Sequence, residues 1–413
     1  MAITTQAHVR PPAPLDAASR PLDVVIGGGG VAAVEAALAL RDLAAERVAI
    51  TLASPRPDFV LEPLAVGAPF AVAHVPRWPL SDIARELDAD HVGAAVAHVD
   101  ADAHRVWLSD GSTLDYDVLV LATGARRRPP FGHAQTFAAG DPGALHGLLE
   151  DLEEGWSKSA AFVVPPGVNW TVPAYELALL TARAVRSMGM TETQITVVTP
   201  EARPLALFGP RASAAAKELL DRAGVGIVVD AYVQSVIPGR GLSLAPGHRT
   251  FDVERVVTLP RVEGLRISGL PHDDAGFLPV DEHACVIGVD DVFAAGDGTD
   301  FPIKQGGLAT QQADAAAEMI AHRLGAVSMP EPFRPVLRGW LLTGAAPRFF
   351  ANPIAGGAGP GVLLAQPPFT ALTKVSGRHL GPWLAAHGQG TADTGAPSPR
   401  QLPSPTKPPT IVP

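Results

Sequence analysis

A run of glycines constrains the fold of this chain more than any other feature, because it lies between a short apolar strand and an alanine-rich helix. Gly28, Gly29 and Gly30 follow the strand sequence LDVVI and precede the helix sequence AAVEAALAL. Together with Ala33 they fit the pattern G-x-G-x-x-A. Gly28 permits a tight turn, Gly30 lets a pyrophosphate approach the helix N-terminus, and Ala33 allows the helix to pack closely on the strand. The segment predicts the start of a dinucleotide-binding α/β domain.

The end of the next strand departs from this fingerprint. The strand RVAITL is followed by Ser54, near the position where an acidic residue normally accepts hydrogen bonds from the adenosine ribose. A serine hydroxyl accepts one such bond, at a loss on the order of 1 kcal/mol. Asp58 is an alternative ribose acceptor. We therefore expect Ser54 to contribute to nucleotide binding more weakly than a carboxylate would.

The length and composition describe a globular protein of two or three domains. The chain has 413 residues, of which 47% are hydrophobic and 18% charged, and its net charge is −10. The negative charge disfavours nucleic-acid binding, and the single cysteine excludes an internal disulfide and favours a reducing compartment. No segment has the apolar character of a signal peptide or a membrane span, and no residue pattern predicts a metal site. We expect a cytoplasmic protein, with a peripheral membrane contact left open.

A second strand–turn–helix unit begins near residue 155 and indicates an internal duplication. The strand AFVV is followed by a Pro/Gly turn, a helix from about Val172 and the strand ITVV, and the later sequence DVFAAGD returns to the pattern of the first domain. The predicted fold class is α/β, with two three-layer Rossmann-like domains, the second inserted in the first, plus a small C-terminal region. The expected divisions are a first domain at 22–150 and 257–326, an inserted domain at 151–256, a C-terminal capping or interface region at 327–388, and disordered tails at 1–21 and 389–413.

Two strand-end motifs and one helix start accompany the glycine turn. The strand YDVLVL ends in ATGA, the strand VFAA ends in GDGT, and the sequence FPIKQ leads into the helix GGLATQQADAAAEMIA. The residues of these motifs are Ala122, Thr123, Gly124, Gly296, Asp297, Gly306, Gly307 and Leu308. In this order, over residues 22–326, they resemble the FAD-dependent pyridine nucleotide–disulfide oxidoreductase superfamily, and within it the branch of sulfide:quinone oxidoreductases and type II NADH dehydrogenases.

The resemblance implies that these motifs hold one FAD non-covalently. Asp297 matches the acidic residue that contacts the ribityl or phosphate region, and the helix that starts at Gly306 points its N-terminus at the N1/C2 edge of the flavin. A helix N-terminus stabilises the negative charge that the reduced ring carries there. Lys304 precedes this helix and is a candidate catalytic cation, the alternative being a solvated loop lysine. Phe59 and Pro63 match a loop beside the isoalloxazine, the alternative being a loop with two buried apolar residues.

The inserted domain departs from the superfamily at its own glycine turn, so tight NAD(P)H binding is not favoured. After the strand AFVV the sequence is PPGVNWTVP, in which Gly167 is the single glycine and the prolines remove backbone donors for a diphosphate. Trp170 would crowd the same space, and Glu201 is displaced from the ribose-reading position. A weak, nonstandard NAD(P)H site stays open.

Two residues bear on redox chemistry without a disulfide. Glu176 lies where related dehydrogenases carry a glutamate near the flavin, and it is a candidate proton-handling residue if burial raises its pKa. The alternative is a glutamate of the first helical turn that the helix dipole favours. Cys285 is the single cysteine and has no partner for a redox disulfide, so the sulfide-oxidising mechanism does not carry over.

The functional prediction is an FAD-dependent oxidoreductase that transfers electrons from an unidentified small-molecule donor to a quinone or similar small acceptor. One alternative keeps NAD(P)H as the donor, with a quinone, ferredoxin or rubredoxin as the acceptor. Another is a flavin-binding partner protein without catalysis. In quinone-reducing relatives the C-terminal region covers the flavin and touches the membrane, and here Leu337, Trp340, Leu341 and Leu342 could form such an apolar face or a capping layer or dimer contact. A homodimer is a further option by analogy with the superfamily.

Overall fold

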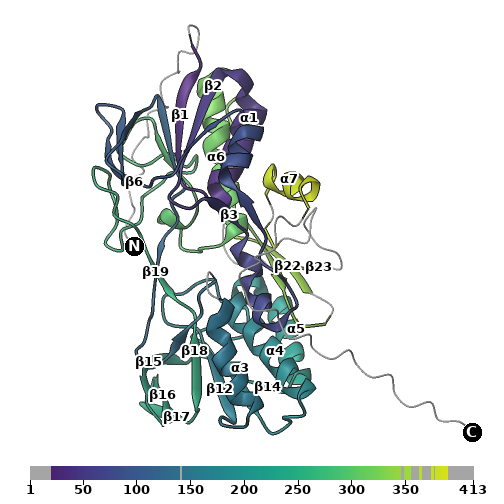
Figure 1. Ribbon diagram of the computed structural model, residues 1–413. Helices are drawn as coiled ribbons and strands as arrows, with labels where there is room; N and C mark the ends of the chain where they lie inside the picture. The colour runs from purple at the N-terminus through teal and green to yellow at the C-terminus, as the bar shows by residue number, and fades with distance from the viewer. Residues whose placement is uncertain are drawn as a thin grey trace, which may run out of the picture.

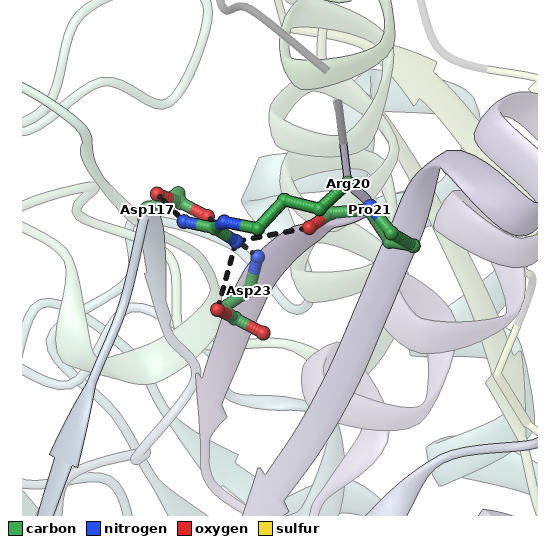
Figure 2. A network of polar contacts seen from close by, with 4 residues as sticks. All are labelled: Arg20, Pro21, Asp23 and Asp117. Carbon is green, nitrogen blue, oxygen red and sulfur yellow. Dashed lines mark hydrogen bonds and ion pairs between the residues drawn. The ribbon is translucent and has the colours of Figure 1, made fainter. Parts of the chain in front are cut away.

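The computed structural model describes residues 20–139, 142–345, 348–354, 362–364, 374–375 and 377–388. Both predicted tails lie outside these residues, except for the end of the first one. There Arg20 donates hydrogen bonds to Asp23 at 2.9 Å and to both carboxylate oxygens of Asp117 at 2.8 Å, as Figure 2 shows. Asp117 also accepts the backbone N–H of Asp23. The exposed network joins the beginnings of two neighbouring strands, β1 (Leu22–Gly27) and β9 (Val118–Leu121).

The first domain is built on a parallel sheet that is covered on both faces (Figure 1). Its strands, in spatial order, are β20 (Val292–Ala294), β9 (Val118–Leu121), β1 (Leu22–Gly27), β2 (Val48–Ala53) and β5 (Asp90–Val92). Every residue of β9, with sequence VLVL, is buried, as expected for a parallel strand enclosed by two layers. One face is covered by helices α1 (Val31–Ala44) and α6 (Gly306–Arg323), which lie side by side. The other face packs against the antiparallel strands β6 (Val96–Asp100), β7 (Arg105–Leu108) and β8 (Thr113–Asp115).

The inserted domain repeats this design. Its parallel sheet has the order β11 (Gln135–Thr136), β18 (Arg255–Thr258), β12 (Ser159–Val163), β13 (Gln194–Val198) and β14 (Val225–Val228). The helices of this domain are α3 (His146–Glu153), α4 (Val172–Ser187) and α5 (Gly209–Arg222), and its small antiparallel sheet comprises β15 (Tyr232–Ile237), β16 (Gly241–Ala245) and β17 (Arg249–Phe251). The α/β class and the duplication predicted from the sequence are confirmed.

The two sheets divide at other residues than the expected boundaries at 150 and 256. Strand β11 pairs with β18 and so belongs to the second sheet, although it precedes residue 150. Strand β18 itself extends to Thr258. The chain passes between the domains along the antiparallel ribbon formed by β10 (Arg126–Arg128) and β19 (Arg261–Glu263). The inserted unit therefore begins after β10 and ends before β19.

The C-terminal region packs on both domains. Its sheet comprises β21 (Val336–Leu341), β22 (Arg348–Pro353) and β23 (Val362–Leu364). The side chains of Leu337, Trp340, Leu341 and Leu342 are at most 9% exposed and pack in the same core as α4. They form a capping layer and not an exposed apolar face.

Helix α7 (Leu380–Ala386) closes the C-terminal region on the first domain. The buried carboxylate of Glu35, in α1, accepts the backbone N–H groups of His379 at 2.9 Å and Leu380 at 2.6 Å. The Trp383 ring packs edge-on against Trp78, with ring centroids 5.6 Å apart. A buried carboxylate at the helix N-terminus thus anchors α7 to α1.

Short elements complete the described structure. They are strands β3 (Asp58–Val60) and β4 (Arg77–Pro79), helix α2 (Leu80–Glu86), and the 3-10 helices η1 (Ala45–Arg47), η2 (Glu62–Phe70), η3 (Pro142–Leu145), η4 (Ala206–Phe208) and η5 (Gly296–Gly298). Across the described ranges, no helix combines the length and the apolar character that crossing a bilayer would require.

Candidate active site

A cavity of about 850 Å³ lies where the first domain, the inserted domain and the C-terminal region meet. The carboxyl ends of β1, β2, β9 and β20 open into it, which is where parallel α/β sheets bind ligands. Most residues predicted from the sequence line this cavity: Gly28, Gly29, Gly30, Ser54, Pro63, Ala122, Thr123, Gly124, Gly296, Asp297, Lys304 and Gly306. The others do not line it: Ala33, Phe59, Glu176, Gly307 and Leu308.

The glycine turn has the geometry of a phosphate cradle. Gly28 has a φ of +138°, and a Cβ there would lie 2.2 Å from the carbonyl oxygen of Ala122. A Cβ on Gly30 would meet nothing within 4 Å, so the space before the first turn of α1 is open. Ala33 is fully buried in the core, which accords with the packing role expected of it. Glycine is therefore required at Gly28 by the protein backbone, and the opening at Gly30 leaves room for a ligand.

The serine at the position expected for ribose binding is engaged in a local turn. Ser54 is 2% exposed, and its Oγ accepts the backbone N–H of Arg56 at 3.2 Å and donates to the Arg56 carbonyl at 3.3 Å. Asp58, on β3, also lines the cavity. Phe59 points to the opposite side of this strand, where it stacks on Trp78, because neighbouring residues of a strand face opposite ways. Phe59 is thus a core residue and does not line the site.

An ion-pair cluster that no sequence motif had indicated lies at the cavity wall. One carboxylate oxygen of Glu62 lies 2.7 Å from the Arg56 guanidinium, and the other lies 2.5 Å from the Arg127 guanidinium. Burial raises the pKa of Glu62, but the two guanidinium groups outweigh it and bring the pKa below its usual value. All three residues line the cavity. The run Arg126–Arg128 after ATGA was the one sequence feature that pointed to this cluster. Its spacing along the chain does not identify Glu62 as the partner.

Asp297, on η5, and Lys304, in the segment before α6, both line the cavity and interact electrostatically. Burial raises the pKa of Asp297, opposed by Lys304 and Arg127. The Lys304 ammonium donates to the carbonyl of Thr299 and lies 3.7 Å from the centroid of the Phe277 ring. Burial lowers the pKa of Lys304 to about 8, against the opposing effect of Asp297. Lys304 is therefore held in the cavity wall and is not a solvated loop lysine.

The N-terminus of α6 is capped by a protein side chain, which the sequence had not indicated. Gln305 Oε1 accepts the backbone N–H of Leu308 at 2.8 Å, and its Nε2 donates to the carbonyl of Arg338 at 3.2 Å. Gly307 is buried against the same Gln305 side chain, while Gly306 lines the cavity. The Leu308 amide therefore bonds within the helix cap and does not face a ligand.

Glu176 forms a buried ion pair with a residue from the C-terminal region. Lys374 Nζ lies 2.7 Å from both Glu176 carboxylate oxygens, and Glu176 also accepts the Leu342 backbone N–H at 2.8 Å. The Glu176 side chain is 0% exposed and that of Lys374 is 8% exposed. Burial raises the pKa of Glu176, against the opposing effect of Lys374. Lys374 lines the cavity, and Glu176 lies behind Lys374. Glu176 is thus a buried, paired carboxylate and not a solvated glutamate of the first helical turn.

The glycine-poor turn of the inserted domain is tied down by protein contacts. Asn169 Nδ2 donates to the carbonyl of Pro302, in the first domain, at 3.1 Å, and the Trp170 ring packs edge-on against Phe208. Glu201, displaced from the ribose position, accepts four hydrogen bonds from within its own domain. These come from the side chains of Thr171, Tyr175 and Thr199 and the backbone of Ala206. The Glu201 carboxylate oxygens, which could otherwise accept hydrogen bonds from a dinucleotide ribose, are thus already bonded within the protein.

Cys285 does not line the cavity. It is half-buried, its backbone N–H bonds the side chain of Asp281, and burial together with Asp281 raises the pKa of its thiol to about 12. Because it is the single cysteine of the sequence, no dithiol is available at this site.

Residues 22–318 match the profile of the pyridine nucleotide-disulphide oxidoreductase family. The chain belongs to this family. Among curated proteins, it is 32% identical to an NADH dehydrogenase-like protein from Mycobacterium tuberculosis over 54% of this chain and 58% of that protein. It is 30% identical to the sulfide-quinone reductase of Aquifex aeolicus over 48% of this chain and 47% of that protein. The chain thus spans about half the length of these relatives.

A solved structure has the same fold as this family member. The sulfide:quinone oxidoreductase of Aquifex aeolicus superposes with a TM-score of 0.75 at 20% sequence identity, over 83% of this chain and 86% of that one. Rhodocoxin reductase from Rhodococcus erythropolis is a further sequence relative, 27% identical over 68% of this chain and 66% of that protein. The likeness in structure establishes the two-domain fold.

Proteins of this family bind FAD, and FAD is the cofactor of this chain. The residues present fit it: the cavity has a φ-constrained glycine turn at Gly28, an open approach at Gly30 and a half-buried acid at Asp297. The first turn of α1 would hold the pyrophosphate, and Asp297 would accept from the ribityl chain. Bound there, FAD would supply two-electron redox chemistry.

Proposed function

We propose that this family member is an FAD-dependent oxidoreductase that delivers an electron pair from a small-molecule donor to a quinone or similar acceptor. The observation that carries the proposal is the buried pair formed by Lys374 and Glu176 at the cavity wall. Reduction of a quinone to a hydroquinone takes up two electrons and two protons. The reduced cofactor would supply both electrons and one proton, and the second proton requires a donor beside the acceptor.

Lys374 is suited to hold such a proton. An ammonium has three N–H donors, of which two are directed at the Glu176 oxygens, leaving one for a group in the cavity. Glu176, whose side chain is 0% exposed, keeps the ammonium in place and balances its charge. A proton given up by Lys374 to a quinone oxygen is replaced through water, since Lys374 retains an 8% exposed side chain.

The names of the relatives favour a second candidate, in which NAD(P)H is the donor. One relative is an NADH dehydrogenase-like protein, and another is the ferredoxin–NAD(+) reductase component of an anthranilate dioxygenase system. The contacts of Asn169, Trp170 and Glu201 support the first candidate instead, because they engage the turn and the acid that a dinucleotide would use.

A stopped-flow experiment distinguishes the candidates. The FAD-loaded protein is reduced with dithionite without oxygen and mixed with a neutral naphthoquinone, while the flavin absorbance is followed. We expect rapid reoxidation in the wild type, and rates lower on the order of a hundredfold in Lys374→Met and Glu176→Gln, since positioned proton donors contribute about that much. Arg334→Gln, which removes an exposed charge of the same region, is the control and retains the wild-type rate.

Two results would contradict the proposal. One is a reduced flavin that the quinone does not reoxidise, and the other is an equal rate in the wild type and both pair variants. If NADH or NADPH bleaches the flavin within seconds, the second candidate replaces the first.

A further inference from the structure

One cation of the cavity lacks a counter-charge among the described residues. Arg338 lies on β21, lines the cavity and is half-buried. No described side chain forms an ion pair or hydrogen bond with its guanidinium, and burial lowers its pKa without an opposing acid. The neighbouring segments outside the description, 346–347, 355–361, 365–373 and residue 376, contain no Asp or Glu.

The other cations of the cavity wall each have an acidic neighbour. Arg56 and Arg127 share Glu62, and Lys374 pairs with Glu176. Asp297 partly offsets the burial that lowers the pKa of Lys304. Removing a charge from water without a partner is unfavourable, and such groups are retained where a ligand supplies the opposite charge. The contrast singles out Arg338 as a residue whose partner is not part of the protein.

The position of Arg338 indicates which part of the cavity that partner occupies. Its backbone carbonyl accepts Gln305 Nε2, and Gln305 caps the helix that begins at Gly306. The glycine turn at Gly28 lies between β1 and α1, at a different strand end. Arg338 therefore stands beside the α6 end of the cavity, where the redox-active ring of FAD is expected, and not beside the pyrophosphate cradle.

We propose that Arg338 binds a negatively charged group at the α6 end of the cavity. The charge has two sources that share this chemistry: the anionic reduced ring of FAD, or an acidic group on the small molecule that exchanges electrons with it. The second source rests on the proposed function, whereas the first needs only the cofactor. In either case a guanidinium provides parallel N–H donors that suit a planar anionic group.

The test compares Arg338→Gln and Arg338→Lys with Arg334→Gln, in which a 72% exposed side chain paired with Glu331 is altered instead. The first measurement is the flavin reduction potential, by equilibration with a reference dye. The second is the KM for naphthoquinone and for naphthoquinone sulfonate. The third is a titration of the oxidised FAD-loaded protein with naphthalene sulfonate, which cannot be reduced, followed by flavin absorbance.

Each source predicts a different result. If the anion is the reduced ring, Arg338→Gln lowers the flavin reduction potential by about 30 mV for each tenfold loss of preference for the reduced form, and it leaves the ratio of the two KM values unchanged. If the anion belongs to the substrate, the potential is unchanged, while the KM for naphthoquinone sulfonate and the dissociation constant of naphthalene sulfonate rise about tenfold or more, as for a lost hydrogen bond to a charged group. Arg338→Lys, which keeps the charge, retains part of the effect in both cases.

The proposal is overturned if Arg338→Gln matches Arg334→Gln in potential, KM ratio and sulfonate affinity while retaining bound FAD. It is also overturned if Arg338→Lys is as impaired as Arg338→Gln in all three, because the effect would then follow packing and not charge. A wild type that reduces neither quinone would refute the proposed function. The potential and the naphthalene sulfonate titration would still decide the role of Arg338.

Discussion

Replacing Lys374 with methionine isolates the energy of the buried pair behind the cavity. The change leaves the Glu176 carboxylate at 0% exposure with a single remaining donor, the Leu342 backbone N–H at 2.8 Å. Breaking a buried pair by removing one partner destabilises a protein by about 3–5 kcal/mol, because an uncompensated charge stays buried. We expect Lys374→Met to fall in this range. The double variant Lys374→Met/Glu176→Gln removes both charges, keeps an acceptor for Leu342, and should lose about 1 kcal/mol or less.

The pH dependence of this loss has a defined sign. Burial raises the pKa of Glu176 in the folded protein, and removing the Lys374 charge raises it further. Between the unfolded pKa near 4.5 and the higher folded value, the unfolded chain is ionised while the folded one is protonated. The contribution of protonated Glu176 to the free energy of unfolding is therefore fully present below the unfolded pKa and is lost as the pH rises through the folded pKa. The deficit of Lys374→Met should shrink as the pH is lowered from 7 towards 5, by up to about 1.4 kcal/mol per pH unit.

The assay is urea unfolding of the FAD-loaded variants at several pH values, followed by circular dichroism and flavin fluorescence. Two results would contradict the expected cost of the unpaired carboxylate. One is a free energy of unfolding for Lys374→Met that is less than about 1 kcal/mol below that of the wild type at pH 7. The other is a loss of stability that does not change with pH and is equally large in the double variant.

Three further outcomes follow from the described contacts. Gly28→Ala should abolish FAD retention, because the new Cβ would lie 2.2 Å from the Ala122 carbonyl oxygen; a purified variant that keeps its flavin absorbance would contradict this. Burial and Glu35 raise the pKa of Asp314 from 3.8 to about 9, so its contribution to stability is full below the unfolded value and is lost progressively as the pH rises to about 9; urea unfolding should show a steeper loss between pH 5 and 9 in the wild type than in Asp314→Asn. The Cys285 thiol, with a pKa of about 12, should resist iodoacetamide at pH 8 in the folded protein, and Cys285→Ser should keep the wild-type rate of flavin reoxidation; rapid labelling or loss of that rate would disprove a structural role.

Local patterns in the sequence were sufficient to predict the ends of the strands that meet at the cavity. The glycine turn, ATGA and GDGT each encode a strand end and the turn after it within about ten residues, and parallel strands bring their carboxyl ends to one edge. Hence Gly28, Thr123 and Asp297 could be placed at one site without coordinates. Phe59 was misplaced because a three-residue strand gives too short an alternation to show which side chain faces the core.

The sequence by itself determined the fold class, the family and the absence of a redox disulfide, because each depends on residue types within a short segment or on a count of cysteines. Only the tertiary structure decided that Lys374 meets Glu176 across 198 positions, that Gln305 caps α6, and that the two-residue strand β11 joins the second sheet. Such contacts arise from the packing of whole domains against one another. No periodicity or spacing along the chain records them, since the residues concerned are brought together only after their separate elements have formed and docked.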